Sequence, residues 1–183
     1  TAMSPYLRIR VGGRETDTHL TGGYNIYNFL AAAAVGHFFG IDDDRIVRAL
    51  ADYTPTNHRS QVNTIGSNIV ISDYYNANPT SMAAALNNLA RLQHPHKRAV
   101  LGDMRELGAI SEEEHRHIIE LCRKLDIDAL FVGPVFHELL PNQSFTTVEE
   151  LNDYLQEHPI LNSMVLVKGS NSIHLDKLSS LLQ

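Results

Sequence analysis

Three features are scarce in this sequence: cysteine, long apolar runs and runs of basic residues. Cys122 is the single cysteine among 183 residues, which excludes an internal disulfide framework and favours a reducing, cytoplasmic location. No apolar run reaches the ~18 residues of a membrane span, and we recognise no signal peptide, so we expect no membrane insertion. The net charge is -6 and no basic run reaches about five residues, which argues against a nucleic-acid partner.

The sequence also lacks the common nucleotide-binding patterns. It contains no G-x-x-x-x-G-K-[ST] phosphate loop, and no G-x-G-x-x-G follows a predicted strand. Gly12-Gly13 and Gly22-Gly23 are better interpreted as turns. The chain alone therefore lacks an obvious cradle for a triphosphate.

The histidines do not predict a metal site. His94 and His96 lie in a predicted loop, and His115 and His117 are two residues apart on a predicted helix. Residues at that helical spacing point in different directions, whereas metal ligands must converge. We therefore expect these four side chains to be solvated on the surface and expect no metal ligands.

After residue 54 the sequence alternates between apolar strands and helical segments. The strands are predicted at 68–72, 99–101, 129–132 and 164–167, and the helices at 81–92, 112–125, 148–157 and 175–182. These strands are continuously apolar, so we expect helices on both of their faces. This pattern predicts an α/β fold with a doubly wound, mostly parallel sheet over residues 54–183.

Residues 1–53 follow a different pattern. It predicts a hairpin and two helices, at 6–11 with 15–20, 25–39 and 42–50. So few elements do not bury a sufficient core of their own. We therefore expect residues 1–53 to form the end of a larger domain.

Polar residues follow the predicted strands of residues 54–183. Asp73, Asp103 and the segment Lys168-Gly169-Ser170 each stand where a strand ends. In open α/β sheets ligands bind at this edge, although Asp and Gly also end strands simply as turn formers. Asn78 suits a helix N-cap, which would place free backbone N–H groups at the same edge. Together these residues favour a ligand-binding edge.

Arg59 follows the polar, proline-bearing segment 54–57 that we interpret as a linker. It is either a solvated surface charge or a phosphate contact, because a guanidinium presents a fork that matches phosphate.

Two segments resemble motifs shared across the Mur ligase family. Residues 20–34, with Gly22, Asn25, Asn28 and four alanines, are similar to the G-x-x-N-x-x-N-x-x-A-A segment that closes the central domain of these enzymes. Arg59 matches the arginine that opens their C-terminal domain.

Three further segments resemble motifs of the family member that uses a D-alanyl dipeptide. Residues 73–82 resemble D-x-Y-N-A-N-x-x-S-M, and residues 101–108, with His115 beyond, resemble L-G-D-M-x-E-L-G…H. Residues 165–170 match its V-K-G-S segment. The resemblance extends from about Leu20 to Leu182, and the first two of these motifs are the most specific.

The resemblance implies ATP-dependent amide-bond synthesis in peptidoglycan precursor formation. UDP-N-acetylmuramoyl-tripeptide would supply the carboxylate, which is phosphorylated, and D-alanyl-D-alanine would supply the amine. ATP would bind between the central and C-terminal domains, with Mg2+ held by the central one, and we expect a monomer.

The resemblance also implies roles for single residues. Asn28 would contact the adenine, and Arg59 and Asp73 the phosphate and ribose. Candidates for dipeptide recognition or domain closure are Asn76, Asn78, Asp103, Lys168 and Ser170. The family's phosphate loop and metal ligands would lie upstream of Thr1, so the resemblance implies that this chain is a C-terminal fragment. Because phosphoryl transfer depends on a phosphate cradle and a metal ion, we expect no catalytic residue within this chain and expect the chain alone to be inactive.

Two alternatives remain open. A non-catalytic α/β module that binds a small molecule would show the same sheet pattern, but it would not explain Asn28, Arg59 and residues 103–106 together. A Mur or folylpolyglutamate-type ligase for another amino acid would share the wider motifs, but not the loop Tyr75-Asn76-Ala77-Asn78.

Overall fold

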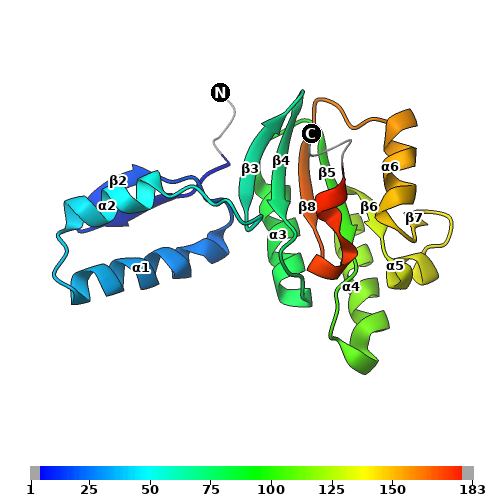
Figure 1. The fold of residues 1–183 in the computed structure, drawn as a ribbon, viewed down its shortest axis with the longest axis horizontal. Helices are drawn as coiled ribbons and strands as arrows, with labels where there is room; N and C mark the ends of the chain where they lie inside the picture. The colour runs from blue at the N-terminus through cyan, green and yellow to red at the C-terminus, as the bar shows by residue number, and fades with distance from the viewer. Residues whose placement is uncertain (1–4, 179–183) are drawn as a thin grey trace.

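The computed structural model describes residues 5–178, which form two bodies side by side (Figure 1). The N-terminal body contains a hairpin of β1 (Arg8–Val11) and β2 (Arg14–Asp17), followed by α1 (Ile26–Phe38) and α2 (Asp43–Asp52). It has its own small apolar cluster, which includes Ile9, Phe29 and Ile46. The predicted hairpin and both predicted helices are therefore confirmed, each with ends shifted by a few residues.

The second body is built on a six-stranded sheet. Its strands lie in the order β3 (Gln61–Ile65), β4 (Asn68–Asp73), β8 (Met164–Lys168), β5 (Lys97–Gly102), β6 (Asp128–Val132) and β7 (Ser144–Phe145). All neighbours are parallel except β3 and β4, which form an antiparallel hairpin. The last strand of the described residues, β8, thus lies between β4 and β5.

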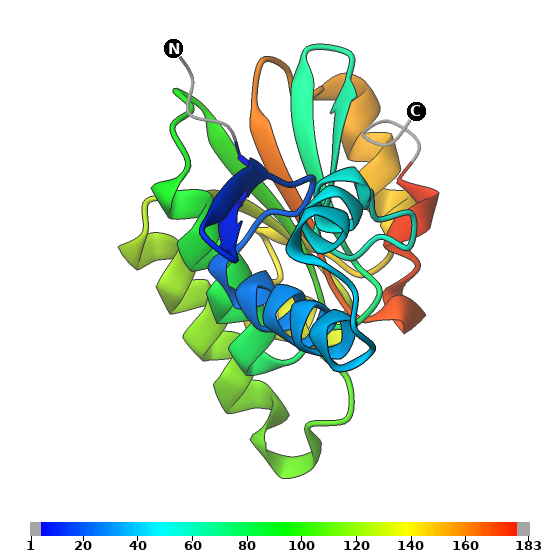
Figure 2. The ribbon, with the colours of Figure 1, turned by 90° about the vertical axis from the view of Figure 1, so that its left-hand side faces the viewer.

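Helices cover both faces of this sheet (Figure 2). On one face α3 (Pro79–Arg91), α4 (Ser111–Lys124) and α5 (Pro134–Leu139) bury side chains such as Leu86, Ile118 and Phe136. On the other face α6 (Val148–Glu157) buries Leu151 against the strands. The predicted α/β fold with a doubly wound, mostly parallel sheet is confirmed.

Some elements differ from the sequence-based expectation. Strands β3 and β7 and the short helix α5 were not predicted. Residues 175–177 form a 3-10 turn instead of the start of an α-helix, and the predicted helical residues 179–182 lie outside the described residues. Within residues 5–178, no helix has both the length and the apolar character needed to cross a membrane.

Candidate functional site

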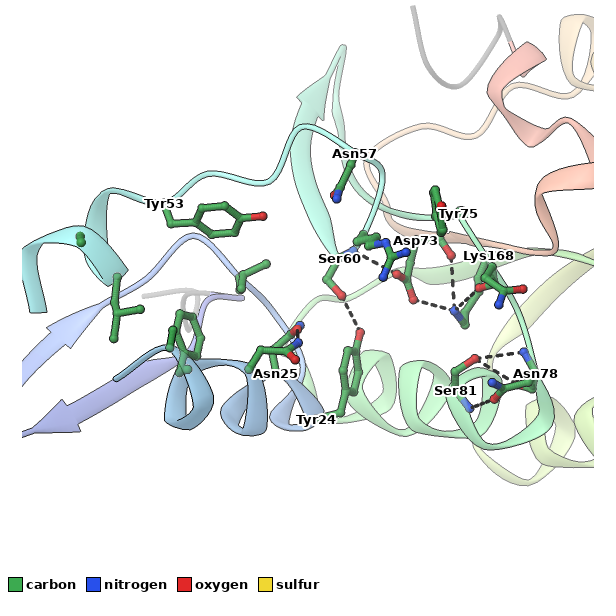
Figure 3. A pocket seen from close by; sticks show the side chains of 18 residues that line it. Tyr24, Asn25, Tyr53, Asn57, Ser60, Asp73, Tyr75, Asn78, Ser81 and Lys168 are labelled. Atoms are coloured by element: carbon green, nitrogen blue, oxygen red, sulfur yellow. Dashed lines mark hydrogen bonds and ion pairs between the residues drawn. The ribbon is translucent and has the colours of Figure 1, made fainter. Parts of the chain in front are cut away.

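A pocket of about 690 Å³ opens between the two bodies (Figure 3). This volume is within the range of small-molecule sites. The N-terminal body, which ends at Tyr53, contributes one wall. The other wall is formed by the segment that joins the bodies (residues 54–60, called the linker below), the carboxyl ends of β4 and β8 and the start of α3. Six predicted site residues line it together: Asn28, Arg59, Asp73, Asn76, Asn78 and Lys168.

The loop after β4 is held by the start of α3. Asn78 Oδ1 accepts a hydrogen bond from Ser81 N at 2.8 Å, and Ser81 Oγ accepts one from Asn78 N at 3.1 Å. Pro79 occupies the first turn, where its missing N–H costs nothing. The predicted N-cap is confirmed, and this reciprocal capping fixes the path of the chain along the pocket.

Asp73 and Lys168 form an ion pair beneath the pocket. Lys168 Nζ lies 2.7 Å from Asp73 Oδ2, and the two side chains are 3 % and 13 % exposed. The ammonium also donates to the carbonyl oxygen of Asn76 at 3.1 Å, while Asp73 Oδ1 accepts from Ser60 N at 3.0 Å. The ion pair therefore connects the sheet to two segments: Lys168 bonds to the loop after β4, and Asp73 bonds to the linker.

Arg59 extends from the linker at the rim of the pocket. Its neighbours His58 and Ser60 both have left-handed backbone conformations, with φ of 55° and 52°, which non-glycine residues seldom adopt. The guanidinium carbon of Arg59 lies 4.0 Å from the centroid of the Tyr75 ring, a cation–π contact. The cation is thus held at the polar end of the pocket.

Amide side chains line the wall formed by the N-terminal body. Asn28 Nδ2 donates to Asn25 Oδ1 at 2.9 Å, and Asn25 Nδ2 donates to the carbonyl oxygen of Thr21 at 2.7 Å. Because the Asn28 amide uses one donor inside the protein, its oxygen is left as an acceptor at the pocket surface.

Within the described residues, three side-chain hydrogen bonds join residues 5–53 to the rest of the chain; one of them is between Thr54 Oγ1 and His19 Nδ1, at 3.1 Å. Tyr24 and Ser60 share one of 2.9 Å between their hydroxyl groups, and Asn88 Nδ2 on α3 donates to Thr21 Oγ1 at 3.0 Å. Burial raises the pKa of Tyr24 to about 12, and the nearby charge of Asp73 acts in the same direction. Tyr24 therefore stays a neutral hydroxyl at this junction.

Asp103 and Ser170 are not among the residues that line this pocket. The Asp103 carboxylate is fully buried and accepts from the backbone N–H groups of Val135 and Phe136 at 2.9 and 3.0 Å. Gly133 lies so close that an added Cβ would be 2.4 Å from the carboxyl carbon of Asp103. Ser170 Oγ accepts from Arg105 N at 3.0 Å. Both side chains shape the loop after β5, and their contact with a substrate stays a prediction.

His115 is buried, contrary to the expected surface position. Its Nε2 accepts from Met104 N at 3.0 Å, and its Nδ1 lies 2.7 Å from the carbonyl oxygen of Ser111. A ring that accepts at one nitrogen and donates at the other is neutral. His115 therefore fixes the loop after β5 from within. His96 and His117 are exposed, as expected, and His94 is partly exposed.

The sequence did not reveal three tyrosines of the pocket. Tyr24, Tyr53 and Tyr75 all line it, and Tyr53 and Tyr75 are about half exposed. The sequence signal that could have identified these tyrosines is that each is an aromatic residue near the end of a predicted element. Within the described residues, no group of three or more histidine, cysteine, aspartate or glutamate side chains is arranged to hold a metal ion.

The chain is similar to known ligases along nearly its whole length. The family described as "Mur ligase, glutamate ligase domain" matches residues 58–171. UDP-N-acetylmuramoyl-tripeptide–D-alanyl-D-alanine ligase of Treponema pallidum is 35 % identical over 187 residues, covering 96 % of this chain and 40 % of the relative. The Escherichia coli ligase of the same name is 32 % identical, with 97 % and 41 % covered.

Solved structures agree with these sequence matches. The crystal structure of MurF from Acinetobacter baumannii is 29 % identical, with a TM-score of 0.74 over 97 % of this chain and 41 % of that one. Folylpolyglutamate synthase of Mycobacterium tuberculosis shares the fold at 18 % identity and a TM-score of 0.57. The chain spans about 40 % of the length of the curated relatives it matches. Because the family match covers residues 58–171, well over half of its length, the chain belongs to the Mur ligase family.

Proposed function

We propose that this chain is the C-terminal part of an ATP-dependent ligase that joins D-alanyl-D-alanine to UDP-N-acetylmuramoyl-tripeptide. The observation that carries the proposal is the pocket between the two bodies, where residues from separate family motifs meet. The relatives that bear this name match the chain at 32–35 % identity over both bodies.

We also propose that residues 1–53 end the central domain and residues 54–183 form the C-terminal domain. Separate hydrophobic clusters support this division. On α1, Tyr27, Leu30 and Phe38 are 75 %, 59 % and 84 % exposed, which is more apolar surface than a finished helical layer presents. A larger domain would cover this face.

In the proposed reaction, a carboxylate oxygen of the tripeptide attacks the γ-phosphorus of ATP, and ADP leaves. The dipeptide amine then attacks the acyl carbon, phosphate leaves, and the nitrogen loses a proton. Mg2+ and the phosphate cradle would be supplied by the remainder of the ligase. This chain would hold the nucleotide, with Asn28 at the adenine and Asp73 and Arg59 at the ribose and phosphate.

The amine substrate would be recognised by the sheet edge and its loops. Candidates are Asn76 and Asn78, which line the pocket, and Lys168, Asp103 and Ser170, which fix the loops around it. We propose a monomeric, cytoplasmic enzyme that has no nucleic-acid partner.

The test replaces the matching C-terminal part of the Escherichia coli ligase with this chain and measures phosphate release. We expect release that requires ATP, the UDP-linked tripeptide and D-alanyl-D-alanine, and none from the 183-residue chain alone. Arg59→Ala should raise the ATP requirement about ten- to a hundredfold, because a hydrogen bond to a charged group contributes roughly 1.5–3 kcal/mol.

Arg91→Ala is the matched control, since Arg91 is exposed at the end of α3 and outside the pocket. Release driven by glutamate instead of the dipeptide would indicate a folylpolyglutamate-type ligase. No substrate-dependent release from the hybrid would favour a binding module and contradict the proposal.

A further inference from the structure

His58, a linker residue with no role in the proposed reaction, stacks on Tyr74. The centroids of the two rings are 4.6 Å apart and their planes lie 19° from parallel. Tyr74 is only 6 % exposed and belongs to the apolar cluster on the α6 face of the sheet. Because the close-packed neighbours of Tyr74 hold its ring in place, the ring gives His58 a fixed surface. His58 is thereby fastened to the sheet body.

The next two linker residues are fastened to the same end of β4. Arg59 lies over the ring of Tyr75, 4.0 Å from its centroid, and Ser60 N donates to Asp73 Oδ1 at 3.0 Å. Figure 3 shows Ser60, Asp73 and Tyr75 close to one another at the pocket. Tyr75 and Asp73 line the pocket, whereas Tyr74 between them packs into the apolar cluster. The linker is therefore held at two places, in the cluster and at the pocket.

The backbone on either side of Arg59 depends on these contacts. His58 and Ser60 have φ of 55° and 52°, in the left-handed region that non-glycine residues seldom adopt. Such conformations persist where the surrounding contacts fix them, and they are found most often at ligand sites. Because the Arg59 side chain is long, the direction of its guanidinium depends on the backbone that carries it. A contact that fixes His58 therefore also directs Arg59.

The charge of Arg59 is available to an anion. Arg59 is exposed, and among the described residues no carboxylate forms an ion pair with it. A cation–π contact uses the face of the guanidinium and leaves its N–H groups free to donate. A guanidinium that is already held in place loses less conformational freedom when an anion binds than a mobile one does.

We propose that His58 is a positioning residue: by stacking on Tyr74, it holds Arg59 over Tyr75 in the direction that suits a phosphate group in the pocket. This inference rests on the proposed function, which assigns the phosphate to Arg59. His58 does not touch the nucleotide and acts only through its neighbour in the chain. Loss of its ring should release the linker and Arg59, and should leave the rest of the pocket in place.

The first measurement is proton NMR of the 183-residue chain. Since Arg59 lies over the Tyr75 ring, we expect the ring to shift the side-chain protons of Arg59 upfield. His58→Asn removes the imidazole ring, while asparagine still tolerates a left-handed backbone, and this change should abolish the upfield shift. His96→Asn is the matched control, because His96 is an exposed histidine outside the pocket. It should leave the Arg59 shifts unchanged.

The second measurement is the KM for ATP of the hybrid ligase. His58→Asn should raise this KM about two- to tenfold, which corresponds to the loss of one aromatic pair. It should leave kcat unchanged, because the loss concerns nucleotide binding. In the presence of Arg59→Ala, His58→Asn should raise the KM no further, since the two residues act as one unit. His96→Asn should change neither constant.

Unchanged Arg59 shifts in His58→Asn would overturn the inference. An equal increase of the KM with and without Arg59 would also overturn it, because the effect would then be a general structural one. A hybrid that releases no phosphate would contradict the proposed function, and the NMR comparison would still decide whether His58 holds Arg59. The two proposals therefore fail separately.

Discussion

Replacing Lys168 by methionine tests whether the buried ion pair holds the sheet edge together. Methionine has a similar length but no ammonium. The change removes the partner of Asp73 Oδ2 at 2.7 Å and the donor to the carbonyl oxygen of Asn76 at 3.1 Å. Asp73 then keeps only the N–H of Ser60.

The cost follows from the burial of the pair. Removing one partner of a fully buried ion pair costs about 3–5 kcal/mol, because the other charge is left without compensation. Asp73 is 13 % exposed, so water can reach it in part and the lower value applies. We expect Lys168→Met to reduce the free energy of unfolding by about 3 kcal/mol, which lowers Tm by about 6–12 °C in a protein of this size.

The assay is thermal and urea unfolding of the 183-residue chain, followed at the transition of the sheet body. Lys177→Met is the control, since Lys177 forms an exposed pair with Glu149 at 3.8 Å, and its loss should change the free energy of unfolding by less than about 0.5 kcal/mol. The double variant with Asp73→Asn and Lys168→Met should be more stable than Lys168→Met alone, because it leaves no buried charge without a partner. Equal effects of the two lysine variants, or strict additivity in the double variant, would refute this reasoning.

Three further predictions concern other parts of the chain. His115→Leu should lower the free energy of unfolding by about 1–3 kcal/mol in urea titrations, because the buried N–H of Met104 loses its acceptor; His115→Gln should recover part of this loss, and equal losses would contradict the reasoning. Burial raises the pKa of Cys122 from 9.0 to about 12, so its contribution to stability is constant below pH ~9 and falls as the pH rises from ~9 towards 12. The free energy of unfolding, measured across this pH range, should fall less steeply in Cys122→Ala than in the unchanged chain. Identical pH profiles of the two proteins would exclude the effect. Tyr24→Phe removes the hydrogen bond to Ser60 and should cost about 1 kcal/mol, with faster limited proteolysis of the linker; unchanged cleavage would show that this bond does not restrain the two bodies.

The sequence predicted the fold class well because its longest strands are continuously apolar. It missed β3, an edge strand in which three of the five side chains, Gln61, Asn63 and Thr64, are polar. It missed α5, which has only six residues and is shorter than the window of about 11–18 residues in which helical periodicity is recognised. Local pattern thus identifies central elements more readily than peripheral ones.

The sequence predicted that the candidate site lies at one edge of the sheet, but it could not predict which side chains contact one another there. Asp73 and Lys168 were both assigned to strand ends, and the structure pairs them because β4 and β8 are neighbours. That strand order depends on how the whole sheet packs. His115 was expected on the surface because its spacing from His117 does not suit a metal site, whereas the helix turns this position towards Phe136. Its neighbours in space come from distant segments.

The central position of β8 has a consequence for folding during synthesis. Ile69 pairs with Met164, so the two sides of the sheet cannot be joined until the final segment of the described chain has left the ribosome. Until then β4 and β5 each present an unpaired edge, and such edges are templates for aggregation. Contacts between residues so far apart in sequence also form slowly. A chain that stops before Met164 would leave two half-sheets with nothing between them, and we expect it to depend on chaperones or to be degraded.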